Sequence, residues 1–355
     1  MPAVENRVSL FNSLIKTVLN PQDADFWLQK INPLWSVNQP LAKITKKQVV
    51  AKDTVSLVLR CNRHVLRGRA GQHHPVTVEI AGRAYQRSYS LMQLDADHLC
   101  LTVKKVNQGK VSSWLVEHSK VGDMLQLGQP YGEMQQFIQT PNLILLAAGS
   151  GITPMLSLLE AMSQSKQLNS IAVRLLYWVK TTEDAAYAEY FQKIAAKNAS
   201  FSVQIFYTQQ QGARLNRSHV AKFEALAEST VYACGPSGFV TSTETLFAQA
   251  AVMQTEAFSL HTDHAVGTET GFAQITLTKS KQTLSIPKGQ SILSSLEQQG
   301  IQPMHGCRMG ICNKCVCNKA QGSTKNLVNG TSNSEAAQLL KICVNSAQSD
   351  LVLDL

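Results

Sequence analysis

Cysteine is the residue type that is spread least evenly along this chain. Five of its eight cysteines fall within 37 residues near the C-terminal end, where an even spread would place fewer than one. They are Cys307, Cys312, Cys315, Cys317 and Cys343. Residues 1–7 hold no apolar signal core, so we expect a cytoplasmic protein with reduced thiols. In a reduced compartment, clustered cysteines indicate a metal site rather than disulfides.

The spacing of these cysteines indicates which metal site they form. Cys307, Cys312 and Cys315 follow a C-x4-C-x2-C pattern, and 27 residues separate Cys315 from Cys343. Four thiolates at this spacing hold a plant-type [2Fe–2S] cluster, whereas a structural zinc site, the alternative, usually shows two C-x2-C pairs. The segment resembles a plant-type ferredoxin domain, and this resemblance implies one [2Fe–2S] cluster on these four cysteines. Cys317 is expected to be a packed thiol.

A second group of residues suits a flavin. The segment Arg87–Ser90 reads R-S-Y-S, and Gly109–Ser112 follows it further along the chain. Both resemble signatures of the ferredoxin–NADP reductase family, R-x-Y-S and G-x-x-S. A guanidinium suits a pyrophosphate, a tyrosine ring stacks on an isoalloxazine, and a helix that starts at a glycine donates to phosphate. The resemblance implies that a flavin, FAD rather than FMN, is bound by Arg87, Ser88, Tyr89, Ser90, Gly109, Val111 and Ser112.

A glycine loop in the middle of the chain suits a dinucleotide. The segment Gly149–Pro154, G-S-G-I-T-P, follows the apolar run Leu143–Ala148. Its glycines permit a tight turn and let a pyrophosphate approach the start of the next helix. The pattern G-x-G-x-x-P departs from the usual dinucleotide fingerprint, but it resembles the nucleotide loop of the same reductase family.

Two later segments extend this resemblance. Residues 232–236 resemble the family's C-G-P element, which places a cysteine beside the nicotinamide, and residues 254–258 resemble its terminal E-x-F. The resemblance implies that Ser90, Cys234 and Glu256 surround the contact between flavin and nicotinamide, where hydride transfer needs alignment more than proton chemistry. As alternatives, Cys234 is a small buried hydrophobe and Glu256 caps a helix. The nicotinamide-binding candidates are Gly149, Gly151, Thr153, Pro154, Cys234, Gly235, Pro236 and Phe258.

Two cations follow predicted strands of the nucleotide region. Lys180 comes after Ile171–Val179, where family members often place an arginine near the adenosine ribose, and Arg214 lies at the start of the next crossover. Either side chain suits the 2′-phosphate dianion of NADPH, so we expect NADPH to be preferred over NADH. The alternative is that both are solvated surface charges.

These motifs lie in three regions of the chain, and the sequence pattern of each region predicts a different fold. Short β-branched runs in residues 37–138 predict an antiparallel β-barrel for the flavin. Strands and helices alternate in residues 139–258, which predicts an α/β, doubly wound nicotinamide domain. A polar linker, residues 259–273, precedes residues 274–355, for which we expect an α+β, β-grasp ferredoxin domain.

The individual elements follow from apolar periodicity. The strand-like runs of the barrel are Thr54–Arg60, Val76–Ile80, Tyr85–Leu91, Leu99–Val106 and Met124–Leu127. Helices of the nicotinamide domain are expected over Met155–Ser163, Ala185–Lys197 and Phe239–Ala250, and near His219–Ala227.

Residues 1–36 precede the barrel and are expected to be helical. Apolar residues recur at helical spacing in residues 10–19, and a second short helix is expected to hold Phe26, Trp27 and Ile31. We expect these apolar faces to pack on the rest of the protein, with docking at a partner or a membrane surface as the alternative.

Composition narrows the class of protein. Hydrophobic residues make up 44% and charged residues 16%, which excludes a disordered chain. The longest apolar run has far fewer than the ~20 residues that cross a bilayer, so we expect no transmembrane segment. Residues 41–138 hold 14 basic and 7 acidic side chains, a large part of the net charge of +9. Because no nucleic-acid motif accompanies this charge, phosphorylated cofactors explain it better than nucleic acid.

The resemblance covers the chain from about residue 37 and implies an NAD(P)H-dependent iron–sulfur flavoprotein reductase. Hydride would pass to FAD, and single electrons would pass through the [2Fe–2S] cluster to a partner. Residues 26–36 resemble the N-terminal stretch of bacterial reductases that serve membrane-bound fatty-acyl desaturases, so a desaturase at the inner face of the membrane is the expected partner. A soluble aromatic-ring or other mono- or dioxygenase is the alternative. A nucleotide-binding iron–sulfur redox sensor is the alternative of another class.

Overall fold

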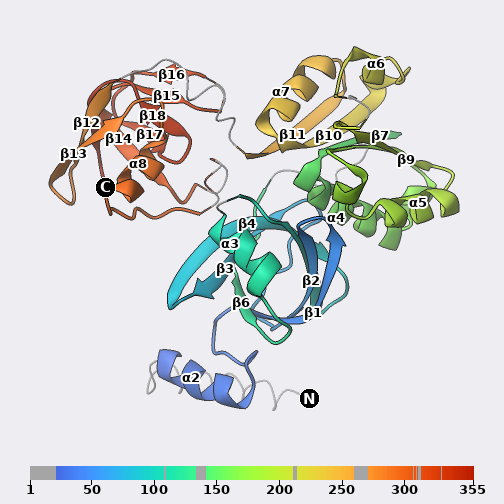
Figure 1. Cartoon of the computed structure of the whole chain (residues 1–355), viewed down its shortest axis with the longest axis horizontal. Coiled ribbons are helices and arrows are strands. Elements are labelled where there is room, and N and C mark those ends of the chain that lie inside the picture. Colours follow the sequence, from blue (N-terminus) through green and yellow to red (C-terminus); the bar gives the residue numbers. More distant parts are fainter. Residues whose placement is uncertain are drawn as a thin grey trace, which may run out of the picture. The chain divides into compact units, whose positions relative to one another are not determined.

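The computed structural model describes residues 21–107, 109–132, 141–210, 214–259, 271–306, 308, 310, 313–328 and 330–355. The chain divides into two compact units, one of residues 1–69 and 73–130 and the other of residues 70–72 and 131–355. The first unit contains a β-barrel, and the second contains a parallel sheet and a separate β-rich fold (Figure 1). The domain boundaries expected within the second unit stay a prediction.

The first unit is built around the predicted antiparallel barrel. Its strands are β1 (Leu41–Ala51), β2 (Thr54–Cys61), β3 (His73–Ile80), β4 (Arg83–Gln93), β5 (His98–Lys104) and β6 (Met124–Leu127), closed in the order β1-β2-β5-β4-β3-β6. Alternate side chains point inward, so Ile44, Leu57 and Leu101 are fully buried. Val111 of α3 (Lys110–Ser113) packs into the same core. The sequence analysis missed β1, because lysines such as the exposed Lys46 interrupt its apolar pattern.

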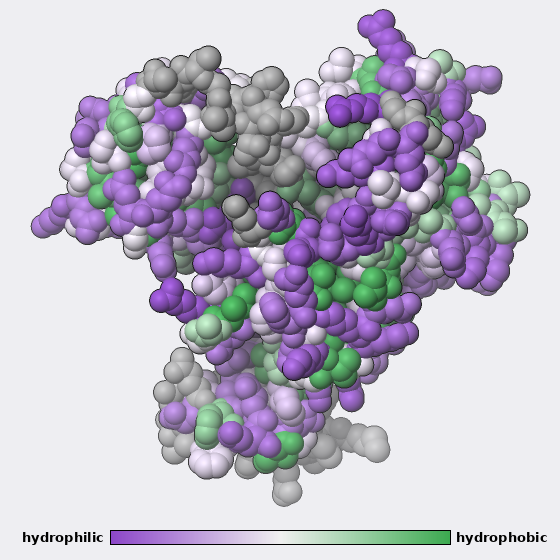
Figure 2. Space-filling view, viewed as in Figure 1, coloured by the Kyte–Doolittle hydropathy of each residue, from purple (hydrophilic) through white to green (hydrophobic). Residues whose placement is uncertain are grey.

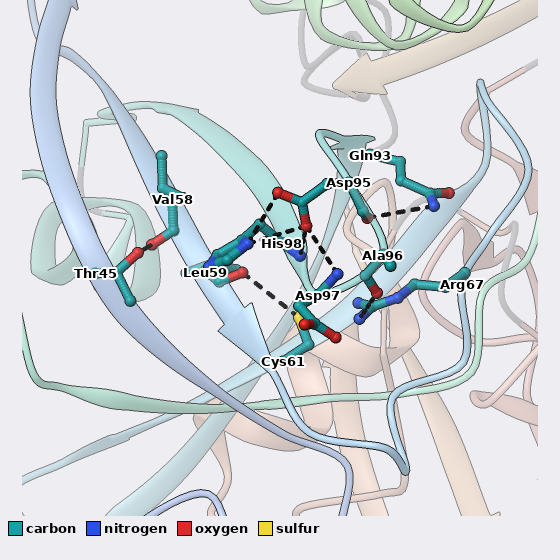
Figure 3. Close-up of polar contacts among 10 residues, drawn as sticks. All are labelled: Thr45, Val58, Leu59, Cys61, Arg67, Gln93, Asp95, Ala96, Asp97 and His98. Carbon is teal, nitrogen blue, oxygen red and sulfur yellow. Dashed lines mark hydrogen bonds and ion pairs between the residues drawn. The ribbon is translucent and has the colours of Figure 1, made fainter. Parts of the chain in front are cut away.

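The turn between β4 and β5 is closed by local polar contacts (Figure 3). The Asp95 carboxylate accepts hydrogen bonds from the backbone N–H groups of Asp97 and His98, both at 2.8 Å. These contacts lower the pKa of Asp95, first through the Asp97 N–H and then through the His98 ring. Arg67 donates to the Ala96 carbonyl at 2.8 Å. An aspartate that bonds the backbone two residues ahead stabilises a reversal of the chain, so β5 returns beside β4.

A helix precedes the barrel, as the sequence predicts, but its apolar side chains do not pack inward. In α2 (Pro21–Ile31), Asp25 is buried and accepts hydrogen bonds from the Ser36 hydroxyl (2.9 Å) and the Val37 N–H (2.6 Å). Phe26, Trp27 and Ile31 are 55%, 69% and 73% exposed. The expectation that these side chains pack on the protein is therefore wrong, because the contact that anchors the helix is polar. The helix expected over residues 10–19 lies outside the described residues.

The second unit contains the predicted doubly wound sheet. Its five parallel strands are β7 (Asn142–Ala148), β8 (Ala172–Val179), β9 (Phe201–Tyr207), β10 (Ser229–Pro236) and β11 (Val252–Ser259), in the order β11-β10-β7-β8-β9. The helices that connect them include α4 (Ile152–Gln164), α5 (Ala188–Lys197) and α7 (Ser237–Leu246). The apolar run that forms β7 is buried because the central strand of such a sheet is covered on both faces.

One helix of this fold is much shorter than expected. In place of a helix near residues 219–227, only α6 (Arg217–Val220) and a 3-10 turn at Leu226–Glu228 are helical. His219 packs against Phe206 at 4.7 Å between ring centroids, and Phe223 packs against Phe247 at 5.9 Å. The apolar residues of this segment thus take part in two separate aromatic contacts and do not form one face of a helix.

The C-terminal part forms the predicted α+β fold. A sheet of β12 (Phe272–Leu277), β13 (Gln282–Pro287), β14 (Val316–Gln321), β17 (Gln338–Lys341) and β19 (Leu351–Leu353) has the order β13-β12-β19-β14-β17. A small second sheet has the order β16-β15-β18, with β15 (Thr324–Asn326), β16 (Ser332–Asn333) and β18 (Asn345–Ala347). Helix α8 (Ile292–Gln298) begins where Ser291 accepts a hydrogen bond from the Ser294 N–H at 3.2 Å, and its Leu293 and Leu296 are buried.

Candidate cofactor sites

The flavin candidates of the barrel lie on β4, opposite β3. Pairing of these strands sets His73 against Ser90 and His74 against Tyr89. The Ser90 hydroxyl lies 3.1 Å from His73 Nε2, and both residues are buried. His74 points elsewhere, since its Nδ1 lies 3.3 Å from the Gly128 carbonyl oxygen. Sequence reasoning missed the partnership of His73 with Ser90, because it depends on the register between two strands.

Burial decides the charge of these histidines. It lowers the pKa of His73 to about 4, with the neighbouring His74 as the second cause. Burial also lowers the pKa of His74 to about 4, although the Gly128 carbonyl acts in the opposite direction. Both rings are therefore neutral at pH 7, so the Ser90 hydroxyl faces a neutral hydrogen-bonding partner and not a cation.

The second flavin motif forms a tight turn at the start of α3. A side chain at Gly109 would place its Cβ 2.5 Å from Ser112 Oγ and 3.0 Å from the Val106 carbonyl oxygen, so it would force Ser112 to shift. The Ser112 hydroxyl accepts from the Val106 N–H (3.1 Å) and donates to the Gly109 carbonyl (3.2 Å). Ser112 thus stabilises the turn itself. Gly109 has no side chain that could cap α3, so the first N–H groups of this helix are donors suited to a phosphate.

The nucleotide loop packs directly on the end of β10. A Cβ at Gly151 would lie 2.0 Å from the Cys234 carbonyl oxygen, and a Cβ at Gly235 would lie 2.9 Å from the Ala148 Cβ. Gly149 has a φ of +57°, which favours glycine. Because Gly151 caps α4 without a side chain, the helix start stays open to a pyrophosphate, which fits the predicted dinucleotide site.

Cys234 and Glu256 are neighbours in register on β10 and β11, and Cys234 also pairs with Ala147 of β7. Cys234 is fully buried, and burial, followed by the Glu256 carboxylate, raises the pKa of its thiol well above the usual value. The sulfur is therefore a neutral thiol. Glu256 lies inside the strand β11 and is not itself part of a helix. Ser90 belongs to the other unit, and its predicted contact with this pair stays a prediction.

The remaining candidates of this fold lie around the same sheet. Thr153 and Pro154 form the first turn of α4, where the Thr153 hydroxyl donates to the Ser150 carbonyl at 3.1 Å. Pro236 and Phe258 lie at the ends of β10 and β11. Lys180 and Arg214 are exposed and follow the adjacent strands β8 and β9. Their binding roles stay predictions.

Two of the four predicted cluster ligands converge in the C-terminal fold. Cys315 Sγ lies 3.1 Å from Cys343 Sγ, and both thiols are buried and free of disulfides. Pairing of β14 with β17, together with a hydrogen bond from the Ile342 N–H to the Cys315 carbonyl (3.2 Å), brings them together. Two adjacent thiols are a donor set that suits an iron–sulfur cluster. Cys307 and Cys312 lie outside the described residues.

Cys317 lies buried in the core of the C-terminal fold. Burial and, secondly, the nearby Cys315 raise the pKa of its thiol to about 12. This position agrees with the packed thiol that the sequence predicts, and its role relative to the cluster stays a prediction. Sequence reasoning missed a further contact beside the cluster loop, in which Arg308 Nη1 donates to Glu297 Oε2 of α8 at 2.8 Å and Arg308 Nη2 to Oε1.

Comparison with known families agrees with the three folds. Residues 41–136 match an oxidoreductase FAD-binding domain, residues 145–245 an oxidoreductase NAD-binding domain, and residues 275–344 a 2Fe-2S iron-sulfur cluster binding domain. The chain belongs to the ferredoxin–NADP reductase family. It is an NAD(P)H-dependent oxidoreductase with a C-terminal [2Fe–2S] domain, and its cofactors are FAD, NAD(P)H and one [2Fe–2S] cluster. When bound, NAD(P)H would supply a hydride, FAD would accept it, and the cluster would carry its two electrons onward one at a time.

Individual relatives have low sequence identity to this chain but align with most of its length. An NADPH oxidoreductase of Mycobacterium tuberculosis is 28% identical over 96% of this reductase and 90% of its own length. The ferredoxin reductase component of a 3-ketosteroid-9-alpha-monooxygenase from the same species is 26% identical over 75% of this reductase and 78% of its own length. The structure of phthalate dioxygenase reductase has the same fold, with a TM-score of 0.65, 23% identity, and 89% and 97% of the two chains covered.

The close approach of Gly151 to β10 makes a specific prediction. Gly151→Ala should lower kcat/KM for NADPH by about tenfold or more, equivalent to about 1.4 kcal/mol, because its Cβ must displace the backbone at Cys234. Stopped-flow reduction of the flavin by NADPH measures this loss. Reduction by dithionite, which needs no nucleotide site, should be unchanged. A Gly151→Ala reductase with wild-type NADPH kinetics would contradict the predicted role of this loop.

The cysteines make a second prediction. Replacement of Cys307, Cys312, Cys315 or Cys343 by Ser should abolish the visible absorbance and the low-temperature EPR signal of the cluster, because each removes one thiolate. Cys317→Ser is the matched control and should retain about two irons per chain, since a [2Fe–2S] cluster needs four ligands only. Loss of the cluster in Cys317→Ser together with its retention in Cys343→Ser would show that the ligand assignment is wrong.

Proposed function

We propose that this reductase delivers electrons from NADPH to a membrane-bound fatty-acyl desaturase. The observation that carries the proposal is the outward apolar surface of α2. Phe26, Trp27 and Ile31, together with Trp35 in the following loop (50% exposed), place large apolar side chains in solvent. Hydrophobic and hydrophilic residues are mixed on the visible face of the segment before the barrel (Figure 2). Aromatic rings of this kind favour the interface between water and lipid or an apolar partner.

Cations accompany these apolar side chains. A groove of ≈ 890 Å³ in the first unit is lined by Ile31 and Trp35 and by the basic residues Lys43, Arg60 and Arg63. Basic residues next to aromatic ones favour the surface of an anionic membrane. Among the described residues, no helix is both long and apolar enough to cross a bilayer.

The alignment with one relative includes part of the segment before the barrel. The Mycobacterium tuberculosis NADPH oxidoreductase aligns over 96% of this chain, which requires that part of residues 1–36 is included. A soluble oxygenase is the second candidate acceptor, and the relatives named as a 3-ketosteroid monooxygenase component and a vanillate O-demethylase oxidoreductase favour it.

Reconstitution of NADPH-driven desaturation tests whether the reductase serves a desaturase. With NADPH and membranes that contain a fatty-acyl desaturase, Trp27→Glu should lower the desaturation rate by about tenfold, because an acid replaces an interfacial aromatic side chain. Val49→Glu, at a 74% exposed apolar site on β1, is the matched control and should desaturate like the wild type. Both variants should reduce cytochrome c at the wild-type rate. If the wild type reduces cytochrome c but supports no desaturation, the desaturase proposal fails and a soluble oxygenase takes its place.

We propose further that NADPH is the nucleotide and that Lys180 and Arg214 bind its 2′-phosphate. Their exposure after the adjacent strands β8 and β9 supports this. The double variant Lys180→Gln, Arg214→Gln should lower kcat/KM for NADPH by about tenfold or more and leave that for NADH unchanged, because only NADPH carries the extra dianion. Steady-state kinetics with both nucleotides measures it. Equal specificity constants in the wild type would contradict the preference.

A further inference from the structure

Lys341 contacts the cluster loop without being one of its ligands. It ends β17, two residues before Cys343, and its ammonium donates a hydrogen bond to the Gly310 carbonyl oxygen at 2.6 Å. Gly310 lies between the cluster ligands Cys307 and Cys312 in the sequence. A residue more than 30 positions further along the chain therefore contacts the backbone between two of the predicted ligands.

The same part of the loop is also fixed by packing. Gly310 has a φ of +77°, and a Cβ there would lie 3.0 Å from a methyl group of Val344, which follows Cys343. The backbone of Lys341 is itself held, because it pairs with Val316 in the register of β14 and β17. The ammonium thus has a defined position beside the loop and is not a mobile surface charge.

We propose that Lys341 is a positioning residue that orients the cluster loop through Gly310 and raises the midpoint potential of the [2Fe–2S] cluster. NADPH supplies two electrons as a hydride through FAD, and the cluster takes them one at a time. Each one-electron reduction adds one negative charge to the cluster and no proton. A fixed positive charge at the loop stabilises that added charge, and cluster potentials respond to local charge and hydrogen bonding.

Lys341 differs in its partner from Arg308, which contacts Glu297 of α8. There the guanidinium charge is balanced by a carboxylate that both Nη atoms contact. The Lys341 ammonium donates to a neutral carbonyl, so this contact leaves its positive charge uncancelled. The proposal therefore rests on Lys341 and not on the net charge of the domain.

Potentiometry of the full-length holoprotein tests the proposal. Lys341→Gln keeps a hydrogen-bond donor but removes the charge, and Lys341→Arg keeps both. In EPR-monitored titrations, the cluster midpoint of Lys341→Gln should shift to a more negative value, and that of Lys341→Arg should stay near the wild type. The flavin midpoint, followed by absorbance in the same samples, should not move in either variant.

Lys288→Gln is the matched control, because it removes the same charge from the same domain at the loop after β13. Its cluster midpoint should equal that of the wild type. An unchanged midpoint in Lys341→Gln, or an equal shift in Lys288→Gln, would overturn the proposal. If Lys341→Gln takes up no cluster while Lys341→Arg does, Lys341 has a purely structural role, and the assigned effect on the potential is wrong.

Discussion

Register between paired strands is the constraint on which each described cofactor site of this reductase depends. Pairing of β3 with β4 sets His73 beside Ser90, and pairing of β10 with β11 sets Cys234 beside Glu256. Because side chains alternate along a strand, a shift of one residue would turn one partner to the opposite face and break the pair. The backbone hydrogen bonds of the sheets thus fix the distances between groups that are far apart in the sequence.

Burial then selects the protonation state of these groups. The two histidines beside the flavin motif and the thiol of Cys234 lie in surroundings that disfavour charge, and all three stay neutral near pH 7. Positive potential lies instead at three places where an anion is expected to bind or to form. Open helix starts without side-chain caps lie at Gly109 and Gly151, and an ammonium lies at the cluster loop.

The segment before the barrel follows a different physical rule from the three cofactor folds. Its helix is anchored by a buried carboxylate, and its aromatic side chains are left in solvent. Burial of the Phe26 and Trp27 rings would stabilise an isolated domain by the hydrophobic effect. Their exposure fits the proposed contact of this segment with a partner that accepts electrons.

The sequence by itself determined the class of fold, the cofactors and the cluster spacing. These follow from short motifs such as Gly149–Pro154 and from strand and helix periodicity, which are local properties of the chain. Only the tertiary structure decided which motif residues are neighbours, that α2 turns its apolar side chains outward, and that Lys341 holds Gly310. It also showed that β1 is a strand despite its lysines. These features depend on register and on contacts between distant segments, and no local pattern of residues encodes either of them.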